Sequence, residues 1–431
     1  MKKYFIILIV ILPLFLQGCT SKDSDMKKVT LDTANSKDAT EDILELTKEQ
    51  KEEDFSYLID TLNELYPFWG ELKDIGINKE ELITKYKELI NNTENSIDYL
   101  NILLDFFKEM GSSFGHLAPI PACYYKNMCD LYRDMSYRKS WYKVLTNPVT
   151  AYMYSVMNPT SEAFQYFDGN KVPDKNNAMN SNYGPSDNIM YTDIINNGKT
   201  AYIRIPSFGM QFIEKEVPQI KKFIEDCYKL SNLIIDIRGN SGGSSDYWIQ
   251  SLVEPNIEHN KTYSKYYLFK KELFSNEAFS TFLAENYFSL KQDRIAIEIL
   301  PEFEKLSSHA VDFDSYINST REIAARPSQY PFKGKIWLLS DRCNASAAEE
   351  FLNFCSQSDF ATIVGEASGG DDCNGDPALF ALPNSGLVFR FDCFYGLNPD
   401  GSCNAVAGEE PDIVCKYNEA LVVCLEKINQ K

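Results

Sequence analysis

The stretch KIWLLSDRCNASAAEEF, residues 335–351, contains a short apolar strand, a turn of small residues and the start of a helix. Its first part, KIWLLS, is the continuous apolar run that is typical of a strand buried on both faces of a parallel sheet. Ser346 lies where the helix begins, and two interpretations of it are open. Asn344 or Ser346 followed by Glu349 has the spacing of a capping box. Alternatively, Ser346 is a nucleophile at the positive end of a helix dipole.

Outward from this stretch, the chain alternates between strands and helices from about residue 200 onward, which indicates an α/β fold. The apolar run NLIIDI leads into the loop RGNSGG, in which Gly242 and Gly243 allow a tight turn and expose N–H groups. A simple strand-to-helix turn has the same composition, and the loop lacks the spacing and the lysine of a P-loop. The loop RGNSGG and the segment that contains Ser346 each directly follow a buried strand. An open α/β sheet has its active site in loops of this kind, at the ends of its strands.

The chain begins MKKYFIILIVILPLFLQGCTSKDSD, which has two lysines, an apolar run and a small residue before Cys19. This pattern is typical of a secretion signal and is too short for a transmembrane helix. It resembles a bacterial lipobox, in which Cys19 becomes the lipidated first residue; an ordinary signal peptide with an incidental cysteine is the alternative. We therefore predict a lipoprotein signal peptide over 1–18, and a lipidated cysteine with a polar tether over 19–50.

Charge and cysteine usage limit the function classes. The formal net charge of −19 is unlike a basic nucleic-acid footprint, so no nucleic-acid partner is expected. Of the eleven cysteines, those after Cys19 permit disulfides outside the cytoplasm, but their pairing cannot be read from the sequence. Their spacing shows no CxxC pair and no Cys/His metal pattern, so no metal site is expected.

The region between the tether and the α/β part divides into two segments. Apolar residues at helical spacing predict three helices between residues 55 and 107, which form an N-terminal helical domain over 51–118. Residues 119–195 are predicted to be an irregular connecting region, and they show no PDZ pattern. The catalytic core is predicted over 196–427.

A serine nucleophile needs a base, and the chain has three histidines, His116, His259 and His309. His259 and His309 lie in polar stretches and are interpreted as surface residues. His116 lies between the helical domain and a proline-rich turn, where a packing or capping histidine is the alternative to a base.

Taken together, these motifs resemble the tail-specific, or C-terminal processing, serine peptidases, and among them the tricorn-type and retinoid-binding-protein-like branch. Four family motifs occur here in order, D-[LIV]-R-x-N-x-G-G at 236–243, S-A-x-E at 346–349, V-G-E-x-[TS]-x-G at 364–370 and G-x-x-P-D-[IV] at 408–413. The resemblance spans residues 50 to 420. It implies a ClpP/crotonase-like core of ββα units preceded by a small helical domain, with Ser346 as the nucleophile.

The resemblance also implies the remaining site residues. Members with a Ser/Lys dyad carry a lysine where this chain has Asp371, so the branch that uses a histidine is implied, with His116 as the base. The acid that orients this histidine is left open among Glu409, Glu410 and Asp371. The oxyanion would be held by the backbone N–H groups of three residues, namely Gly242, Gly243 and Ala347.

The expected function is therefore that of a lipid-anchored, extracytoplasmic serine peptidase of the cell membrane, acting on a peptide or protein substrate without a metal or organic cofactor. Its membrane contact would be through the N-terminal lipid. A catalytically inactive binding or scaffolding lipoprotein is one alternative, because the lysine is absent and the acid is displaced. A non-peptide esterase is another, since a fold does not fix its substrate. The oligomeric state is not set by the sequence.

Overall fold

A computed structural model describes residues 45–110, 114–135, 138–156, 189–274, 295–370 and 377–430. The predicted signal peptide, the lipidated Cys19, most of the tether and the candidate acid Asp371 lie outside the described residues.

A six-stranded sheet forms the centre of the α/β part, with strand order β13-β9-β8-β4-β3-β2. All neighbouring strands are parallel except β2 and β3, which are antiparallel. The apolar runs KIWLLS and NLIIDI form its two central strands, as predicted. The strands are β2 (Tyr191–Ile195), β3 (Thr200–Arg204), β4 (Asn232–Asp236), β8 (Lys335–Ser340), β9 (Thr362–Gly365) and β13 (Ile413–Val414).

Helices cover both faces of this sheet, because successive strand residues point to opposite sides. Ile235 and Leu338 pack on the side of the amphipathic helices α9 (Ile213–Asp226) and α13 (Ala347–Ser358). Ile234, Trp337 and Leu339 pack on the other side, under α15 (Ala420–Asn429). Between β4 and β8 the chain also forms α10 (Ser245–Trp248), the π-helix η3 (Ile249–Val253) and the 3-10 turn η4 (Glu254–Asn256), and the turn η2 (Met210–Phe212) precedes α9.

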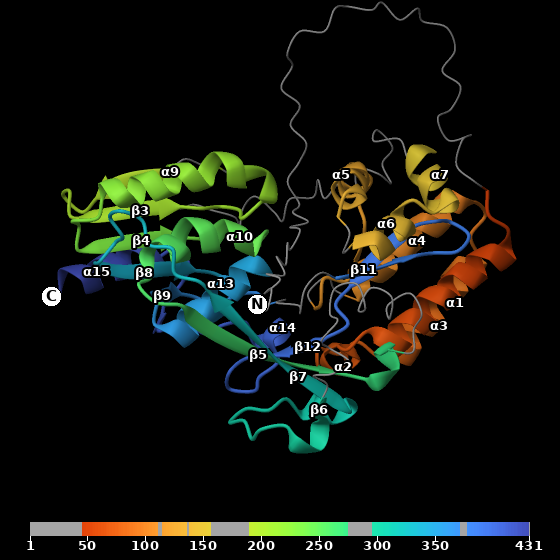
Figure 1. Ribbon diagram of the computed structural model, residues 1–431. Coiled ribbons are helices and arrows are strands. Elements are labelled where there is room, and N and C mark those ends of the chain that lie inside the picture. The colour runs from red at the N-terminus through yellow and green to blue at the C-terminus, as the bar shows by residue number, and fades with distance from the viewer. Residues whose placement is uncertain are drawn as a thin grey trace, which may run out of the picture.

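A second, antiparallel sheet has the order β12-β5-β7-β6. Its long strands β5 and β7 run from the α/β part towards the N-terminal helices (Figure 1). The elements of this region are β5 (Lys261–Phe269), η5 (Lys271–Phe274), β6 (Ile295–Ala296), η6 (Ile297–Ile299), η7 (Ser308–Asp312), β7 (Ser315–Ile323), β12 (Tyr395–Leu397) and α14 (Asn404–Ala407).

The three predicted N-terminal helices are present as α1, α3 and α4. Thr47 caps the first with a complete capping box, and the side chains of Asn78 and Asn95 cap the other two. The bounds are α1 (Lys48–Leu65), the short α2 (Trp69–Asp74), α3 (Lys79–Asn91) and α4 (Ser96–Glu109).

Residues 119–195, predicted as an irregular connecting region, contain three helices in their described part. These are α5 (Ala122–Arg133), α6 (Lys139–Leu145) and α7 (Pro148–Val156). Their apolar side chains join the same hydrophobic core as those of the N-terminal helices, and this burial stabilises these short helices.

Two strands from the C-terminal half of the chain are built into this helical region. β10 (Ala378–Ala381) and β11 (Val388–Phe391) form a third sheet with β1 (Ala118–Pro119), in the order β1-β11-β10. Their apolar side chains join the hydrophobic core of α1 and α4; the ring centroids of Phe107 and Phe389, for example, are 6.0 Å apart. The helical region is therefore completed by residues that lie far along the chain, and the predicted domain boundaries stay a prediction.

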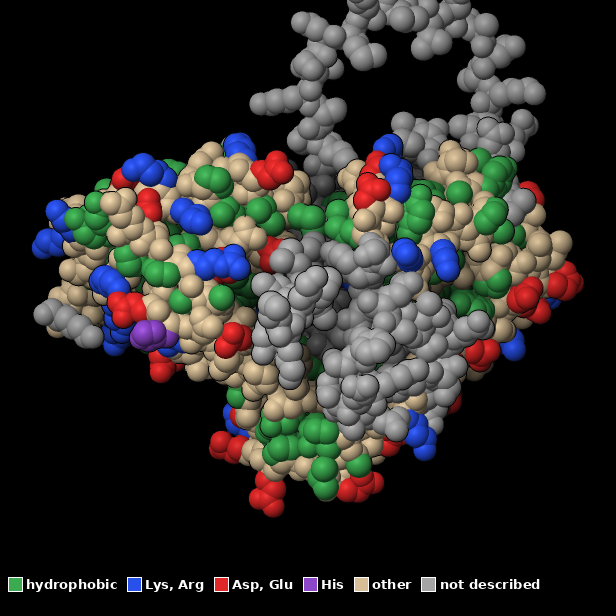
Figure 2. All heavy atoms as spheres, viewed as in Figure 1, with side chains coloured by type: hydrophobic (Ala, Val, Ile, Leu, Met, Phe, Trp, Pro, Cys, Tyr) green, Lys and Arg blue, Asp and Glu red, His purple; other side chains and the backbone are tan. Residues whose placement is uncertain are grey.

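Three further observations concern membrane-spanning helices, the cysteines and the surface. No helix in the described ranges is long and apolar enough to cross a membrane. The cysteines whose side chains are described are free thiols. On the face shown in Figure 2, acidic and basic side chains are interspersed, and apolar side chains gather at the tip of the lower lobe.

Candidate active site

The carboxyl ends of β4 and β8 lie side by side at one edge of the central sheet, because these strands are parallel neighbours with Asp236 opposite Leu339. The loops that follow them, residues 237–243 and 341–346, therefore leave the sheet at the same edge. Open α/β sheets bind their ligands at such strand ends. The glycine loop and the serine segment are thus brought together as the sequence analysis expected.

Asn344 connects these two loops. Its side-chain amide donates hydrogen bonds to the carbonyl oxygens of Ile237, at 2.6 Å, and Asn240, at 3.0 Å. Its side-chain oxygen accepts from the N–H of Asp341 at 2.8 Å. All of its side-chain groups are therefore used within the loops, and Asn344 does not cap the helix.

Ser346 lies at the N-cap position of α13, but its side chain makes no capping hydrogen bond. Its backbone is strained, with φ 56° and ψ −124°, a region that L-residues avoid. A strained serine on a sharp strand-to-helix turn is typical of a nucleophile that the backbone presents to a substrate. The capping interpretation of Ser346 is therefore wrong, and the nucleophile interpretation is the one that agrees with the geometry.

The glycine loop lies directly against the serine turn. A methyl group at Gly242 would overlap the carbonyl oxygen of Ala345 and come within 2.7 Å of the Ala347 amide nitrogen. Gly242 also has φ +101°, which glycine adopts without strain. Only glycine therefore lets the two loops approach so closely.

The predicted oxyanion donors differ in whether their N–H groups are available. The N–H of Gly242 already donates to the side-chain oxygen of Asn240 at 2.8 Å, so this donor is committed within its own loop. In the part of the chain that the structure describes, the N–H groups of Gly243 and Ala347 donate no hydrogen bond. These two remain as the candidate oxyanion donors.

A buried ion pair supports the base of the glycine loop. Asp236 is fully buried and accepts two hydrogen bonds from the Arg238 guanidinium, at 2.9 Å and 2.6 Å, and one from the Tyr202 hydroxyl at 2.7 Å. Burial alone would raise the pKa of Asp236, but Arg238 holds this pKa below its ordinary value. The carboxylate is thus charged and fully engaged, which suits a structural support and not a proton donor.

Glu349 lies in the first turn of α13, three residues after Ser346, and is fully buried. The side-chain amide of Asn404 donates to it at 2.6 Å. Burial raises the pKa of Glu349 to about 7, although the nearby Lys265 opposes this shift. The Glu349 side chain does not accept from the Ser346 N–H, which donates to the Gly370 carbonyl instead. Both hydrogen bonds of the predicted capping box are therefore absent.

His116 lies just before β1, and its ring contacts Asp392, which directly follows β11. The imidazole Nδ1 is 2.9 Å from Oδ2 and 3.1 Å from Oδ1 of this carboxylate. Asp392 is buried, and its backbone N–H donates to the Gly115 carbonyl at 2.7 Å. A carboxylate at Nδ1 fixes the ring and favours the tautomer whose Nε2 can accept a proton.

The pairing of β1 with β11 brings this histidine and this carboxylate together. The two strands are antiparallel, with Ala118 opposite Arg390. Continuing the same register by two residues places His116 opposite Asp392. The pair is 276 residues apart in sequence, so no local pattern could have identified Asp392.

The structure thus gives His116 a different carboxylate from the three that the sequence analysis proposed. The Glu409 side chain accepts a hydrogen bond from Asn353 at 3.1 Å, which ties its loop to α13. Glu410 is exposed, and Asp371 lies outside the described residues.

Positive φ occurs at His116 as well as at Ser346. Among the described residues other than glycine, positive φ occurs at His116, Asn196, Asn197, Ser346 and Asp359. Asn, Asp and His are enriched in this region, whereas serine adopts it rarely, so the strain is specific to Ser346. Strain of this kind tends to occur at functional sites.

Within the described ranges, no three His, Cys, Asp or Glu side chains lie close enough together to hold a metal ion.

Comparisons with known proteins identify the family and the fold of this chain. The sequence profile of peptidase family S41 matches residues 199–415, half of the chain. A protein from Parabacteroides merdae described as a peptidase is 16% identical, with a TM-score of 0.51, over 88% of this chain and 96% of that chain. Mature CPAF complexed with lactacystin is 12% identical, with a TM-score of 0.53, over 89% and 98%. At these identities the likeness concerns the fold alone. No curated protein sequence matches the chain.

Proposed function

Because this chain belongs to peptidase family S41, we propose that it is a serine peptidase in which Ser346 is the nucleophile and His116, oriented by Asp392, is the base. The observation that carries the proposal is the strained, uncapped Ser346 held against the glycine loop. The His116–Asp392 pair supports it, because a base held by a carboxylate is what a serine nucleophile requires.

In the first step, the Ser346 hydroxyl attacks the carbonyl carbon of the scissile peptide bond. His116 accepts the hydroxyl proton at Nε2, and Asp392 stabilises the imidazolium through Nδ1–H. The negative charge that develops on the carbonyl oxygen is stabilised by the N–H groups of Gly243 and Ala347.

In the second step, the tetrahedral intermediate collapses, the C–N bond breaks and His116 gives its proton to the leaving amine. A water molecule then attacks the acyl group on Ser346 while His116 accepts a proton from it. The bond between the acyl carbon and Ser346 Oγ then breaks, His116 returns its proton to Oγ, and the acid product leaves with the serine hydroxyl restored. In these steps Ser346, His116, Asp392 and two backbone N–H groups act on the peptide substrate and one water molecule.

Hydrolysis of an unfolded protein tests this function. We expect the full-length protein in detergent to cleave reduced casein, and Ser346→Ala to lower the rate by about 10⁴-fold or more. Ser356→Ala is the matched control, because Ser356 lies near the other end of α13 and its hydroxyl bonds only the Asn353 carbonyl. Cleavage that survives in Ser346→Ala contradicts the proposal. A folded parent without turnover would indicate a binding lipoprotein.

We also propose that the protein is anchored outside the cytoplasm by a lipid on Cys19. The support is the lipobox-like segment and the polar tether that follows it. Two-phase partitioning in a cloud-point detergent tests this: the parent should enter the detergent phase and Cys19→Ser should not. Equal partitioning of the two proteins contradicts the anchor.

A further inference from the structure

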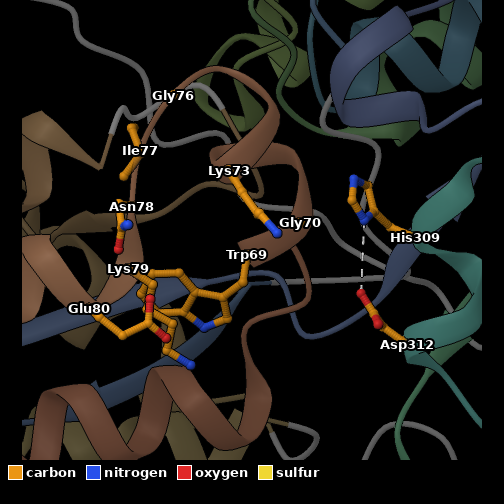
Figure 3. A pocket seen from close by; sticks show the side chains of 10 residues that line it. All are labelled: Trp69, Gly70, Lys73, Gly76, Ile77, Asn78, Lys79, Glu80, His309 and Asp312. Carbon is orange, nitrogen blue, oxygen red and sulfur yellow. Dashed lines mark ion pairs between the residues drawn. The ribbon is translucent and has the colours of Figure 1, made fainter.

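A cavity of about 600 Å³ lies outside the proposed catalytic groups, where α2 and the start of α3 face η7. Figure 3 shows its lining from close by. Trp69 provides a flat apolar wall and Ile77 a smaller one, and His309 and Asp312 lie on the opposite side. The cavity thus joins apolar surface to charged groups within one concave site, which is the usual composition of a small-ligand pocket.

Two lysines, Lys73 and Lys79, line this cavity, and no described carboxylate lies within ion-pair distance of their ammonium groups. The Lys79 ammonium lies 4.8 Å from the centroid of the Trp69 ring, and Figure 3 shows Lys73 extending between Trp69 and His309. Burial lowers the pKa of Lys79, although the nearby carboxylate of Glu80 opposes this shift. An anion placed beside Lys79 would likewise favour its charged form.

Two carboxylates around the cavity, those of Asp74 and Asp312, interact with the His309 imidazole. The Nε2 of His309 is 2.8 Å from the Asp74 carboxylate, and Nδ1 is 3.9 Å from that of Asp312. The hydrogen bond to Asp74 raises the pKa of His309, so the imidazolium form offsets one of these two carboxylate charges. The remaining acidic group of the lining is Glu80, an exposed side chain. Lys73, Lys79 and the His309 imidazolium thus balance the charges of Asp74, Asp312 and Glu80, so this concave site is neutral in a chain with a net charge of −19.

We propose that this pocket binds a ligand that joins a carboxylate to an apolar or aromatic group. The apolar group would lie on Trp69, and the carboxylate would lie between the ammonium groups of Lys73 and Lys79. Two sources share this chemistry, a free carboxylic acid and the last residue of a peptide. Ile75, 60% exposed on the short loop after α2, extends the apolar surface near the cavity. The proposal is independent of the chemistry at Ser346.

Calorimetric titration of the full-length protein tests the site, with tryptophan fluorescence as a second readout. Trp69 is the half-buried tryptophan of the lining, whereas Trp141, Trp248 and Trp337 are buried. We expect N-acetyl-L-phenylalanine to bind and to change the fluorescence. N-acetyl-L-phenylalaninamide, which lacks the carboxylate, should bind about tenfold more weakly or not at all.

Variants separate this pocket from unspecific binding. Lys79→Gln and Lys73→Gln should each weaken binding of the acid about tenfold, and Lys73 is exposed, so its substitution leaves the fold intact. Lys335→Gln is the matched control, because Lys335 also lies over a tryptophan, 4.0 Å from the Trp337 ring, away from this cavity. It should bind as the parent does.

A blocked tripeptide that ends in phenylalanine distinguishes the two sources, measured in the Ser346→Ala background to prevent hydrolysis. Tighter binding than the single residue assigns the pocket to a peptide terminus, and equal binding assigns it to a free acid. The proposal is overturned if the acid does not bind, if the amide binds equally well, or if Lys73→Gln and Lys79→Gln bind as tightly as Lys335→Gln.

Discussion

Ser346 has φ 56° and ψ −124°, and this backbone strain is the strongest evidence for the proposed site at the scale of single residues. A serine that made a capping hydrogen bond would gain stability from its position, but Ser346 makes none. Its backbone conformation costs on the order of 1–3 kcal/mol. Such a cost is consistent with a residue kept for its chemistry.

The strain at Ser346 predicts an unusual order of stabilities. Ser346→Gly should be about 1 kcal/mol more stable than Ser346→Ala, because glycine adopts this φ freely. At Ser356, within α13, the order should reverse by about the same amount, because glycine is unfavourable in a helix. Urea unfolding of the four variants measures both differences. An alanine variant that is the more stable one at both positions would show that Ser346 is not strained.

Asp392 is the site residue that the sequence analysis missed, and its substitution tests the role of its carboxylate. Asp392→Asn removes the negative charge beside His116 and allows the wrong tautomer of the ring. We expect kcat/KM to fall roughly 10²–10⁴-fold while the fold is retained. The pH profile of kcat/KM should change too, which a purely structural residue would not cause. Asp130→Asn, on an exposed face of α5, is the control. Unchanged kcat/KM in Asp392→Asn would exclude this orienting role.

At the scale of elements, the sequence allowed the strand–loop–helix units around the nucleophile to be predicted, because their information is local. NLIIDI and KIWLLS are apolar runs of strand length, and the glycines and small residues that follow them specify turns. The pairing of β1 with β11 could not be predicted, since β1 is two residues long and its partner lies far along the chain. The candidate nucleophile was therefore found from the sequence, and the acid was not.

The contact between the glycine loop and the serine turn predicts a specific failure for Gly242→Ala. The added methyl group would overlap the Ala345 carbonyl, so the two loops must move apart. This movement would also separate the oxyanion donors Gly243 and Ala347, which lie on the two loops. We expect activity to be lost. Gly198→Ala is a matched control, because Gly198 also has a positive φ, +81°, but has open space around its Cα. It should lose about 1 kcal/mol of stability and keep its activity. Equal activity of the two variants would contradict the account of this contact.

The buried Glu349 at the start of α13 predicts how stability depends on pH. Its pKa is about 7 in the folded protein, against an ordinary value of 4.5, so the unfolded state releases this proton first. Folding stability should therefore fall as pH rises from about 4.5 to 7, by up to about 3 kcal/mol from this group.

Glu349→Gln removes this contribution, so its stability relative to the parent should rise across the same pH range. Denaturant unfolding at several pH values measures the difference. Glu88→Gln, at an exposed position of α3, should show no such trend. A Glu349→Gln variant that parallels the parent at every pH would exclude a raised pKa for Glu349.

At the scale of the whole molecule, the candidate nucleophile and base belong to different parts of the structure. Ser346 lies on the α/β part, whereas His116 and Asp392 lie where β1 and β11 join the N-terminal helices. The sequence predicted an α/β core preceded by helices, and the fold agrees with it. The sequence did not show that β10 and β11 return to complete the helical region. This return gives His116 its carboxylate, and the mechanism requires the two parts of the structure to bring His116 to Ser346.

Labelling with a fluorophosphonate probe tests the central claim most directly, because the probe reacts only with an activated serine. The parent, Ser346→Ala, His116→Ala and the control His259→Ala should be compared after each is shown to be folded. The account predicts rapid labelling of the parent and of His259→Ala, no labelling of Ser346→Ala and much slower labelling of His116→Ala. A folded parent that is not labelled, or a His116→Ala variant labelled at the parent's rate, would contradict it.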